Sequence, residues 1–255
     1  MASGYDSRMP TVDAHGDAVG PAPRHVVVIA DGDVPPRAEL DAAWPGWADG
    51  VELVIAADGG LARTAAAGLE AAQLVGDLDS IDPGLLARAE AAGLPIHRVP
   101  VDKDESDAEL ALLEALATGA TKVTVLGAFG GPRLDHGLAN VWLLAHPALA
   151  ATEVVLIDAR SRASLVTAPD ATGRPVTRAL AGRIGSLVSL LPFGGEVHGI
   201  TTSGLRYPLA DEPLVLGPAR GLSNVRDSSD ASVTIRSGRL LVVEAAPADG
   251  GLSSG

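Results

Sequence analysis

The chain has 255 residues, of which 47% are hydrophobic, so it is long enough for one large domain or two modest domains with proper cores. The 32 acidic residues outnumber the 19 lysines and arginines, and the resulting net charge of -13 makes nucleic acid an unexpected partner, because such a surface repels polyanions. The absence of cysteine excludes a disulfide framework, a thiolate-bound metal and a thiol nucleophile.

Residues 1–23 form the first segment, which is rich in Gly, Pro, Asp and Ala. It lacks the apolar central region of a signal peptide, and we expect it to be a disordered tail. No apolar run of the chain reaches the roughly 18 residues that a membrane span needs. We therefore expect a cytoplasmic protein without a membrane partner.

From residue 25 onward, short β-branched runs alternate with Ala- and Leu-rich segments of helical period. This alternation is typical of a mainly parallel sheet with flanking helices, and it predicts an α/β domain over residues 24–172. Asp82-Pro83 and Ser106 have the form of helix N-caps, and Asp107 follows in the first turn of its helix. The predicted strands are residues 25–30, 53–57, 72–75, 96–101, 122–126 and 153–157.

After about residue 172 the helical period disappears, and short apolar runs are separated by Gly and Pro. This pattern predicts a smaller C-terminal antiparallel β-sandwich domain over residues 173–245, followed by a frayed end at 246–255. The predicted strands are residues 187–191, 197–201, 214–216, 233–236 and 240–243.

Polar motifs follow four successive strands of the predicted α/β domain. Ligands of open α/β sheets bind beyond the carboxyl ends of the strands, so these motifs are the candidates for a site. They are Asp58-Gly59-Gly60, Gly76-Asp77-Leu78-Asp79-Ser80, Asp102-Lys103-Asp104-Glu105-Ser106-Asp107 and Gly127-Ala128-Phe129-Gly130-Gly131-Pro132-Arg133-Leu134-Asp135-His136.

Asp77 and Asp79 are two residues apart, and in an extended segment both side chains point to the same side. Paired carboxylates suit Mg²⁺, which prefers oxygen ligands and is usually shared between one or two carboxylates and substrate phosphates. Asp107, in a first helical turn, is a third candidate ligand, and Asp104 a further one. Taken alone, the Asp-x-Asp pattern also fits a turn or a helix cap.

The glycines of the first and last motifs would allow backbone amides to approach phosphate closely. Neither motif matches a Walker A loop or a dinucleotide fingerprint. Arg133 is the candidate phosphate-binding residue, because a guanidinium group can form bidentate hydrogen bonds to phosphate oxygens. The alternative is a surface arginine beside a helix-capping Asp135, and His136 fits either a phosphate contact or a hydrogen bond near the helix start. The five glycines are Gly59, Gly60, Gly127, Gly130 and Gly131.

The four motifs, in this order, resemble the thiamine pyrophosphokinase family. Two further segments, Thr201-Thr202-Ser203-Gly204-Leu205-Arg206-Tyr207 and Gly221-Leu222-Ser223-Asn224, look like the β-domain signature of that family. The similarity spans residues 25–243. Pro132 stands between the paired glycines and Arg133, where the family has none, and Ser106 stands where threonine is common.

The resemblance implies transfer of the terminal two phosphates of ATP to the hydroxyethyl oxygen of thiamine, which gives thiamine diphosphate and AMP. It also implies a homodimer with the thiamine pocket between the subunits. Residue by residue, the resemblance implies magnesium ligands at Asp77, Asp79 and Asp107 and nucleotide contacts from Asp58, Arg133 and Asp135. It also implies thiamine contacts from Ser223 and Asn224 and contacts with either ligand from Lys103 and Asp104.

Two other functions remain open from the sequence. A pyrophosphokinase for another hydroxymethyl heterocycle, such as a pterin, would need the aspartates and glycines but not Ser223-Asn224. A non-catalytic nucleotide-sensing module would not need an intact set of carboxylates. For catalysis, Asp79 is the candidate base that accepts the proton of the thiamine hydroxyl.

Overall fold

The computed structural model describes residues 11–12, 18–19 and 24–246. Within the tail, β1 (Thr11–Val12) and β2 (Ala18–Val19) pair antiparallel. The rest of the tail that we expected to be disordered, and residues 247–255 of the expected frayed end, lie outside the described residues. Among the described helices, none combines the length and the apolar character needed to cross a membrane.

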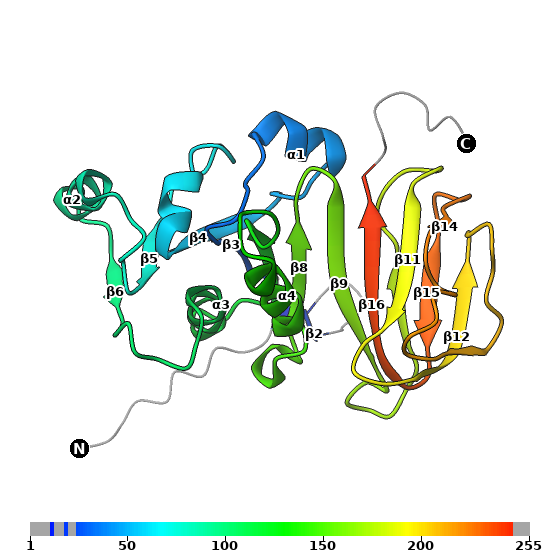
Figure 1. The fold of residues 1–255 in the computed structure, drawn as a ribbon. Helices are drawn as coiled ribbons and strands as arrows, with labels where there is room; N and C mark the ends of the chain where they lie inside the picture. Colours follow the sequence, from blue (N-terminus) through cyan, green and yellow to red (C-terminus); the bar gives the residue numbers. More distant parts are fainter. Residues whose placement is uncertain (1–10, 13–17, 20–23, 247–255) are drawn as a thin grey trace, which may run out of the picture.

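A ten-stranded sheet extends across the molecule in the order β14-β11-β16-β9-β8-β7-β3-β4-β5-β6 (Figure 1). The six strands from β8 to β6 pair in parallel. They confirm all six strands predicted for the α/β part, with ends that differ from the prediction by up to three residues. These strands are β3 (His25–Ile29), β4 (Val51–Ala57), β5 (Gln73–Gly76), β6 (Ile96–Arg98), β7 (Lys122–Leu126) and β8 (Glu153–Ile157).

Helices cover both faces of the parallel half, because its central strands bury side chains on both sides. Val26 and Val28 of β3 pack in the cluster that includes α3, whereas Val27 and Ile29 pack with Leu40 of α1. The helices are α1 (Arg37–Ala43), α2 (Pro83–Ala91), α3 (Asp107–Ala117), α4 (Leu134–Leu143), and the 3-10 helices η1 (Asp58–Arg63) and η2 (Pro147–Leu149).

Both predicted helix caps are confirmed. The Asp82 carboxylate accepts a hydrogen bond from the Leu85 amide at 2.9 Å, and the Ser106 hydroxyl accepts one from the Glu109 amide at 3.2 Å. Each cap satisfies one of the amides that the first helical turn leaves without a partner. The cap at Ser106 therefore fixes where α3 starts, and with it the position of Asp107.

The C-terminal half is an antiparallel sandwich, as predicted. A second sheet, in the order β10-β15-β12-β13, packs on the antiparallel part of the long sheet. Ile200, Val233 and Ile235 of the second sheet meet Leu190 and Leu240 of the long sheet in one buried cluster. The strands are β10 (Val176–Ala179), β11 (Leu187–Pro192), β12 (Val197–Ser203), β13 (Glu212–Leu214), β14 (Asn224–Val225), β15 (Ser232–Ile235) and β16 (Gly238–Ala245).

Strand β9 (Ser161–Ala168) joins the two halves and was not predicted. It pairs antiparallel with β8 on one side and with β16 on the other, so one sheet continues from the α/β half into the sandwich. Strands β10 and β14 were also missed. The division after residue 172 stays a prediction, but the hydrogen-bonded sheet itself is shared by both halves.

Candidate active site

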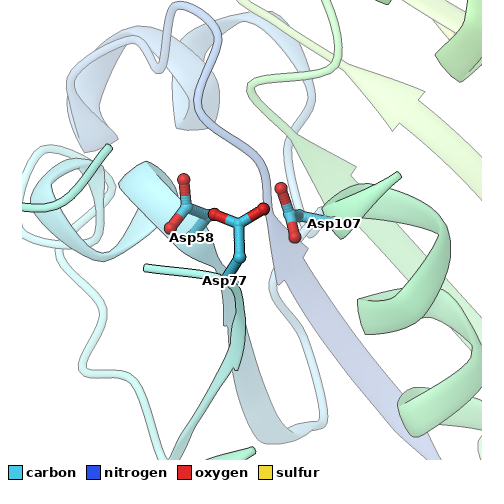
Figure 2. Close-up of side chains that lie close together, drawn as sticks. All are labelled: Asp58, Asp77 and Asp107. Carbon is cyan, nitrogen blue, oxygen red and sulfur yellow. The ribbon is translucent and has the colours of Figure 1, made fainter. Parts of the chain in front are cut away.

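Three carboxylates converge beyond the carboxyl ends of the parallel strands. Asp58 follows β4, Asp77 follows β5, and Asp107 begins α3. Each offers one carboxylate oxygen, and these oxygens all lie within 4.8 Å of one another (Figure 2). The strand-end rule therefore brings together side chains from three separate motifs of the sequence.

Lys103 lies between two of these carboxylates. Its Nζ is 2.7 Å from Asp77 Oδ2 and 3.1 Å from Asp107 Oδ1, and its side chain is only 11% exposed. Burial alone would lower the pKa of Lys103, but the bonds to Asp77 and Asp107 outweigh it and the pKa is raised. The Lys103 ammonium in turn lowers the pKa of Asp77. One ammonium against three carboxylates leaves an excess of negative charge at this edge.

Asp58 is the buried member of the cluster, with 5% of its surface exposed. Burial raises its pKa, and the charges of Asp107 and Asp77 raise it further. Among the described residues, none donates a hydrogen bond to Asp58 Oδ1. A buried carboxylate oxygen without a donor, beside two other carboxylates, has the chemistry of a ligand for a hard divalent cation such as Mg²⁺.

Asp79 lies outside this cluster. Our expectation that Asp77 and Asp79 share one side assumed an extended segment, and that assumption is wrong, because Leu78 between them has a φ of 69°. Asp79 is exposed, its amide donates to Asp77 Oδ1 at 3.2 Å, and its carboxylate accepts from the Ser80 hydroxyl at 3.0 Å. Asp58 takes its place in the cluster, and a ligand role for Asp79 stays a prediction.

Backbone conformations at this edge are unusual. Asp58 has a backbone φ of 45°, a value that residues other than glycine rarely adopt. A Cβ added at Gly76 would lie 3.0 Å from Asp58 Cβ, so glycine lets β5 pass close to Asp58. Strained residues of this kind concentrate at functional sites, where the surrounding packing holds them in place.

Four of the five glycines predicted to approach phosphate are in tight contact with protein. A Cβ at Gly60 would lie 2.0 Å from the Ile29 carbonyl oxygen, and one at Gly127 would lie 2.3 Å from that of Ala30. A Cβ at Gly59 would lie 2.5 Å from Asp31 Oδ1, and one at Gly130 would lie 2.3 Å from Asp33 Oδ2.

Gly131 is the exception, because a Cβ there would meet only the Cα of Gly32, at 3.9 Å. Its exposed backbone is the part of these loops best placed to admit a phosphate. Phosphate contacts of all five glycines stay predictions.

The segment Asp31-Gly32-Asp33 follows β3 at the same edge and was missed from the sequence. Asp33 Oδ2 accepts a hydrogen bond from the Gly131 amide at 3.3 Å, and Asp31 Oδ1 is 3.5 Å from Arg63 Nε. The strand-end rule applied to the first strand would have found both aspartates. They join the loop after β3 to the loop after β7 and to η1.

Arg133, Asp135 and His136 lie exposed at the start of α4. Arg133 and Asp135 form an ion pair with each other, and the side chains are 62% and 64% exposed. The guanidinium lowers the pKa of Asp135 to about 2. The first turn of α4 is thus open to solvent beside Gly131, and the nucleotide contacts of these three residues stay predictions, as does the contact of the exposed Asp104 with substrate.

Ser223 and Asn224 lie far from the carboxylates within one chain. They belong to the β14 edge of the long sheet, whereas β5 and β6 form the opposite edge (Figure 1). The buried Asn224 amide group is already bonded to the Tyr207 backbone, accepting from its N–H at 3.0 Å and donating to its carbonyl at 2.7 Å. Ser223 is exposed with a φ of 59°. Thiamine contacts from this pair stay predictions, and for Asn224 the bonds favour a role in shaping the loop.

The fold and the cluster define an open α/β sheet with a candidate cation site at its carboxyl edge, continued into an antiparallel sandwich. Comparison with known families agrees: residues 47–156 match the catalytic domain of thiamin pyrophosphokinase, and residues 178–242 match its vitamin B1 binding domain. The chain belongs to the thiamine pyrophosphokinase family, which confirms the resemblance that the motifs indicated.

Individual relatives agree with this assignment. The thiamine pyrophosphokinase of Bacillus subtilis (strain 168) is 28% identical over 198 residues, which cover 78% of this chain and 89% of the relative. The crystal structure of the thiamine pyrophosphokinase from Bacillus subtilis superposes with a TM-score of 0.74 at 26% identity, covering 88% of this chain and 99% of the other. The thiamin pyrophosphokinase of Candida albicans, at 15% identity, has the same fold with a TM-score of 0.69, covering 88% and 90% of the two chains.

Proposed function

We propose that the protein transfers the terminal two phosphates of ATP to the hydroxyethyl oxygen of thiamine, giving thiamine diphosphate and AMP. The observation that carries the proposal is the convergence of Asp58, Asp77 and Asp107 at the carboxyl edge of a chain of this family. The need for ATP also supports a cytoplasmic location.

The carboxylates of Asp58, Asp77 and Asp107 would hold Mg²⁺, with Asp79 as a further predicted ligand. The ion would supply positive charge to the phosphate oxygens and to the departing AMP. In the reaction, the thiamine oxygen forms a bond to the β-phosphorus, and the bond from that phosphorus to the oxygen bridging the α- and β-phosphates breaks. The exposed Asp79 carboxylate, next to Asp77, is the proposed acceptor of the hydroxyl proton.

Lys103 adds a second positive charge to the proposed site. Its ammonium already lies within hydrogen-bond distance of Asp77 and Asp107, so a small rotation of its flexible side chain would carry it to an entering phosphate. Positioning and charge neutralisation of this kind account for most of the catalysis in phosphoryl transfer.

Thiamine is favoured over a pterin as the acceptor. The match to a vitamin B1 binding domain spans residues 178–242, which include the segment from Thr201 to Tyr207 and the Ser223-Asn224 pair. A pterin pyrophosphokinase would need neither. A purely nucleotide-sensing role is not supported, because the carboxylates needed for chemistry are all present and three of them converge.

The deciding experiment incubates the purified protein with magnesium-ATP and thiamine and identifies the products. We expect AMP and thiamine diphosphate in equal amounts, with no product after chelation of the metal. A hydroxymethylpterin offered in place of thiamine serves as the competing acceptor and should not react. Formation of ADP with thiamine monophosphate, or no turnover, would contradict the proposal.

We also propose that the protein acts as a homodimer with the thiamine site between subunits. The distance between the two edges of the long sheet supports this, because Ser223 of one chain could then face the carboxylates of the other. Helix α4 offers a surface for it: Leu134, Leu138 and Trp142 recur every four residues and are 77%, 47% and 64% exposed.

Replacing Trp142 by glutamate is therefore expected to shift the protein from dimer to monomer and to lower turnover, because a buried unpaired carboxylate opposes association. Analytical ultracentrifugation measures the first effect. The matched control is Ile184→Glu, which places the same charge on another exposed apolar side chain, 65% exposed and outside α4. A Trp142→Glu variant that stays dimeric would rule out α4 as the interface.

A further inference from the structure

A pocket of about 440 Å³ lies on the α1 side of the long sheet, away from the carboxylate cluster. Its floor includes Thr124 of β7 together with Val155 and Ile157 of β8, and its walls are the segment after α1 and the segment between β10 and β11. None of the strand-end motifs contributes to it. A cavity of this volume is in the range that small-molecule sites occupy.

The charges that line the pocket have one sign. Its lining includes four cationic side chains and no carboxylate, in a chain whose net charge is -13. The four are Lys122, Arg162, Arg183 and Arg226. Arg162 is neutralised by the buried Glu244, so the remaining three determine the charge of the pocket.

Arg226 is the most buried of these cations, with 5% of its surface exposed. Its guanidinium donates only to backbone carbonyls, those of Leu180, Ala181, Ser228 and Ser229. Carbonyl dipoles satisfy its N–H groups without cancelling its charge, whereas Lys122 lies opposite Glu153 in the neighbouring strand β8. Among the described residues, no carboxylate pairs with Arg226, so its positive charge is the one that the pocket leaves uncompensated.

Two tryptophans supply the apolar part of the lining. Trp44 and Trp47 are 5% and 7% exposed, and both indole N–H groups already have acceptors, the Asp158 carbonyl and the Asp41 carboxylate. What the indoles offer an occupant is therefore the small part of their ring surface that is not buried, and not a hydrogen-bond donor; the Arg37 guanidinium already lies over the Trp47 ring, 5.1 Å from its centroid. Ring surface combined with an uncompensated cation suits a planar ring that carries an anionic group.

We propose that this pocket is a second binding site, which takes a small aromatic anion such as a ring bearing a phosphate group. The ring contacts the Trp44 and Trp47 side, and the anionic group lies toward Lys122, Arg183 and Arg226. The site is separate from the carboxylates of the proposed reaction, and its occupancy does not depend on magnesium.

Tryptophan fluorescence tests the proposal directly, because the chain has only three tryptophans. A Trp142→Phe background removes the tryptophan on α4 and leaves Trp44 and Trp47 as reporters in the pocket. Phenyl phosphate is the probe, with phenol and inorganic phosphate as its two halves, and titrations are run without magnesium. We expect saturable quenching by phenyl phosphate, with at least about tenfold weaker binding of either half, since a charge-assisted contact contributes about 1.5–3 kcal/mol.

Lys122→Gln and Arg183→Gln, made in the same background, should each weaken phenyl phosphate binding by about tenfold or more while leaving turnover of magnesium-ATP and thiamine unchanged. Arg88→Gln, an exposed arginine on α2, is the charge-matched control and should change neither. Thermal melting curves check that the variants remain folded. Binding of phenol as tight as that of phenyl phosphate would overturn the anion site, and so would absence of saturable binding or indifference to Lys122→Gln and Arg183→Gln.

Discussion

Asp77→Asn is expected to lower kcat by about 100- to 1,000-fold while the protein stays folded, because the change removes one charged ligand from the converging carboxylates. The two side chains have nearly the same shape, and Lys103 keeps Asp107 as a partner in the variant. Steady-state kinetics at several magnesium concentrations measure the loss, and a circular dichroism melting curve checks the fold.

Asp102→Asn is the matched control for this variant. Asp102 lies in the same acidic loop as Lys103 but is exposed and outside the cluster, so we expect a change of less than about tenfold. Asp79→Asn separates the geometry from the resemblance. In the magnesium concentration needed for half-maximal turnover, the cluster predicts a smaller change for Asp79→Asn than for Asp58→Asn, whereas the resemblance, which makes Asp79 a ligand, predicts a change equal to that of Asp77→Asn. Full activity of Asp77→Asn would remove Asp77 from the proposed metal site.

Arg162→Met is expected to lower the free energy of unfolding by about 3–5 kcal/mol, because it leaves a buried carboxylate without its partner. Glu244, in β16, is 1% exposed and forms an ion pair with Arg162 of β9, next to it in the sheet. Burying the unpaired charge costs far more than the lost contact alone. Denaturant unfolding measures the difference.

The control for charge removal is Arg236→Met. Arg236 pairs with Asp211 at 2.7 Å, but the two side chains are 58% and 60% exposed, and we expect a loss below about 1 kcal/mol. The double variant Arg162→Met with Glu244→Met should recover most of the lost stability, because no charge is then left in the interior. Equal losses in the single and double variants would mean that packing, and not the unpaired charge, explains the effect.

The sequence alone was sufficient for the parallel strands, the two helix caps and the edge of the sheet at which the carboxylates converge. Each depends on short-range information. The β-branched run of β3, for example, is apolar at every position because both faces of a parallel strand are covered. Parallel strands also place their carboxyl ends at one edge, so the sequence predicts a common location for Asp58, Asp77 and Asp107.

What only the tertiary structure decided depends on contacts between distant segments. The φ of 69° at Leu78 turns Asp79 away from the position that two-residue alternation predicts. Asp58, buried at the start of η1, lies beside Asp77 and Asp107 instead. The side-chain amide of Asn224 is bonded to the backbone of Tyr207, 17 residues away, a contact that the local sequence does not predict. Strand β9 and the continuity of the sheet depend on pairing with β16, whose partner residues are 70 to 84 positions away, and a local pattern does not encode this pairing.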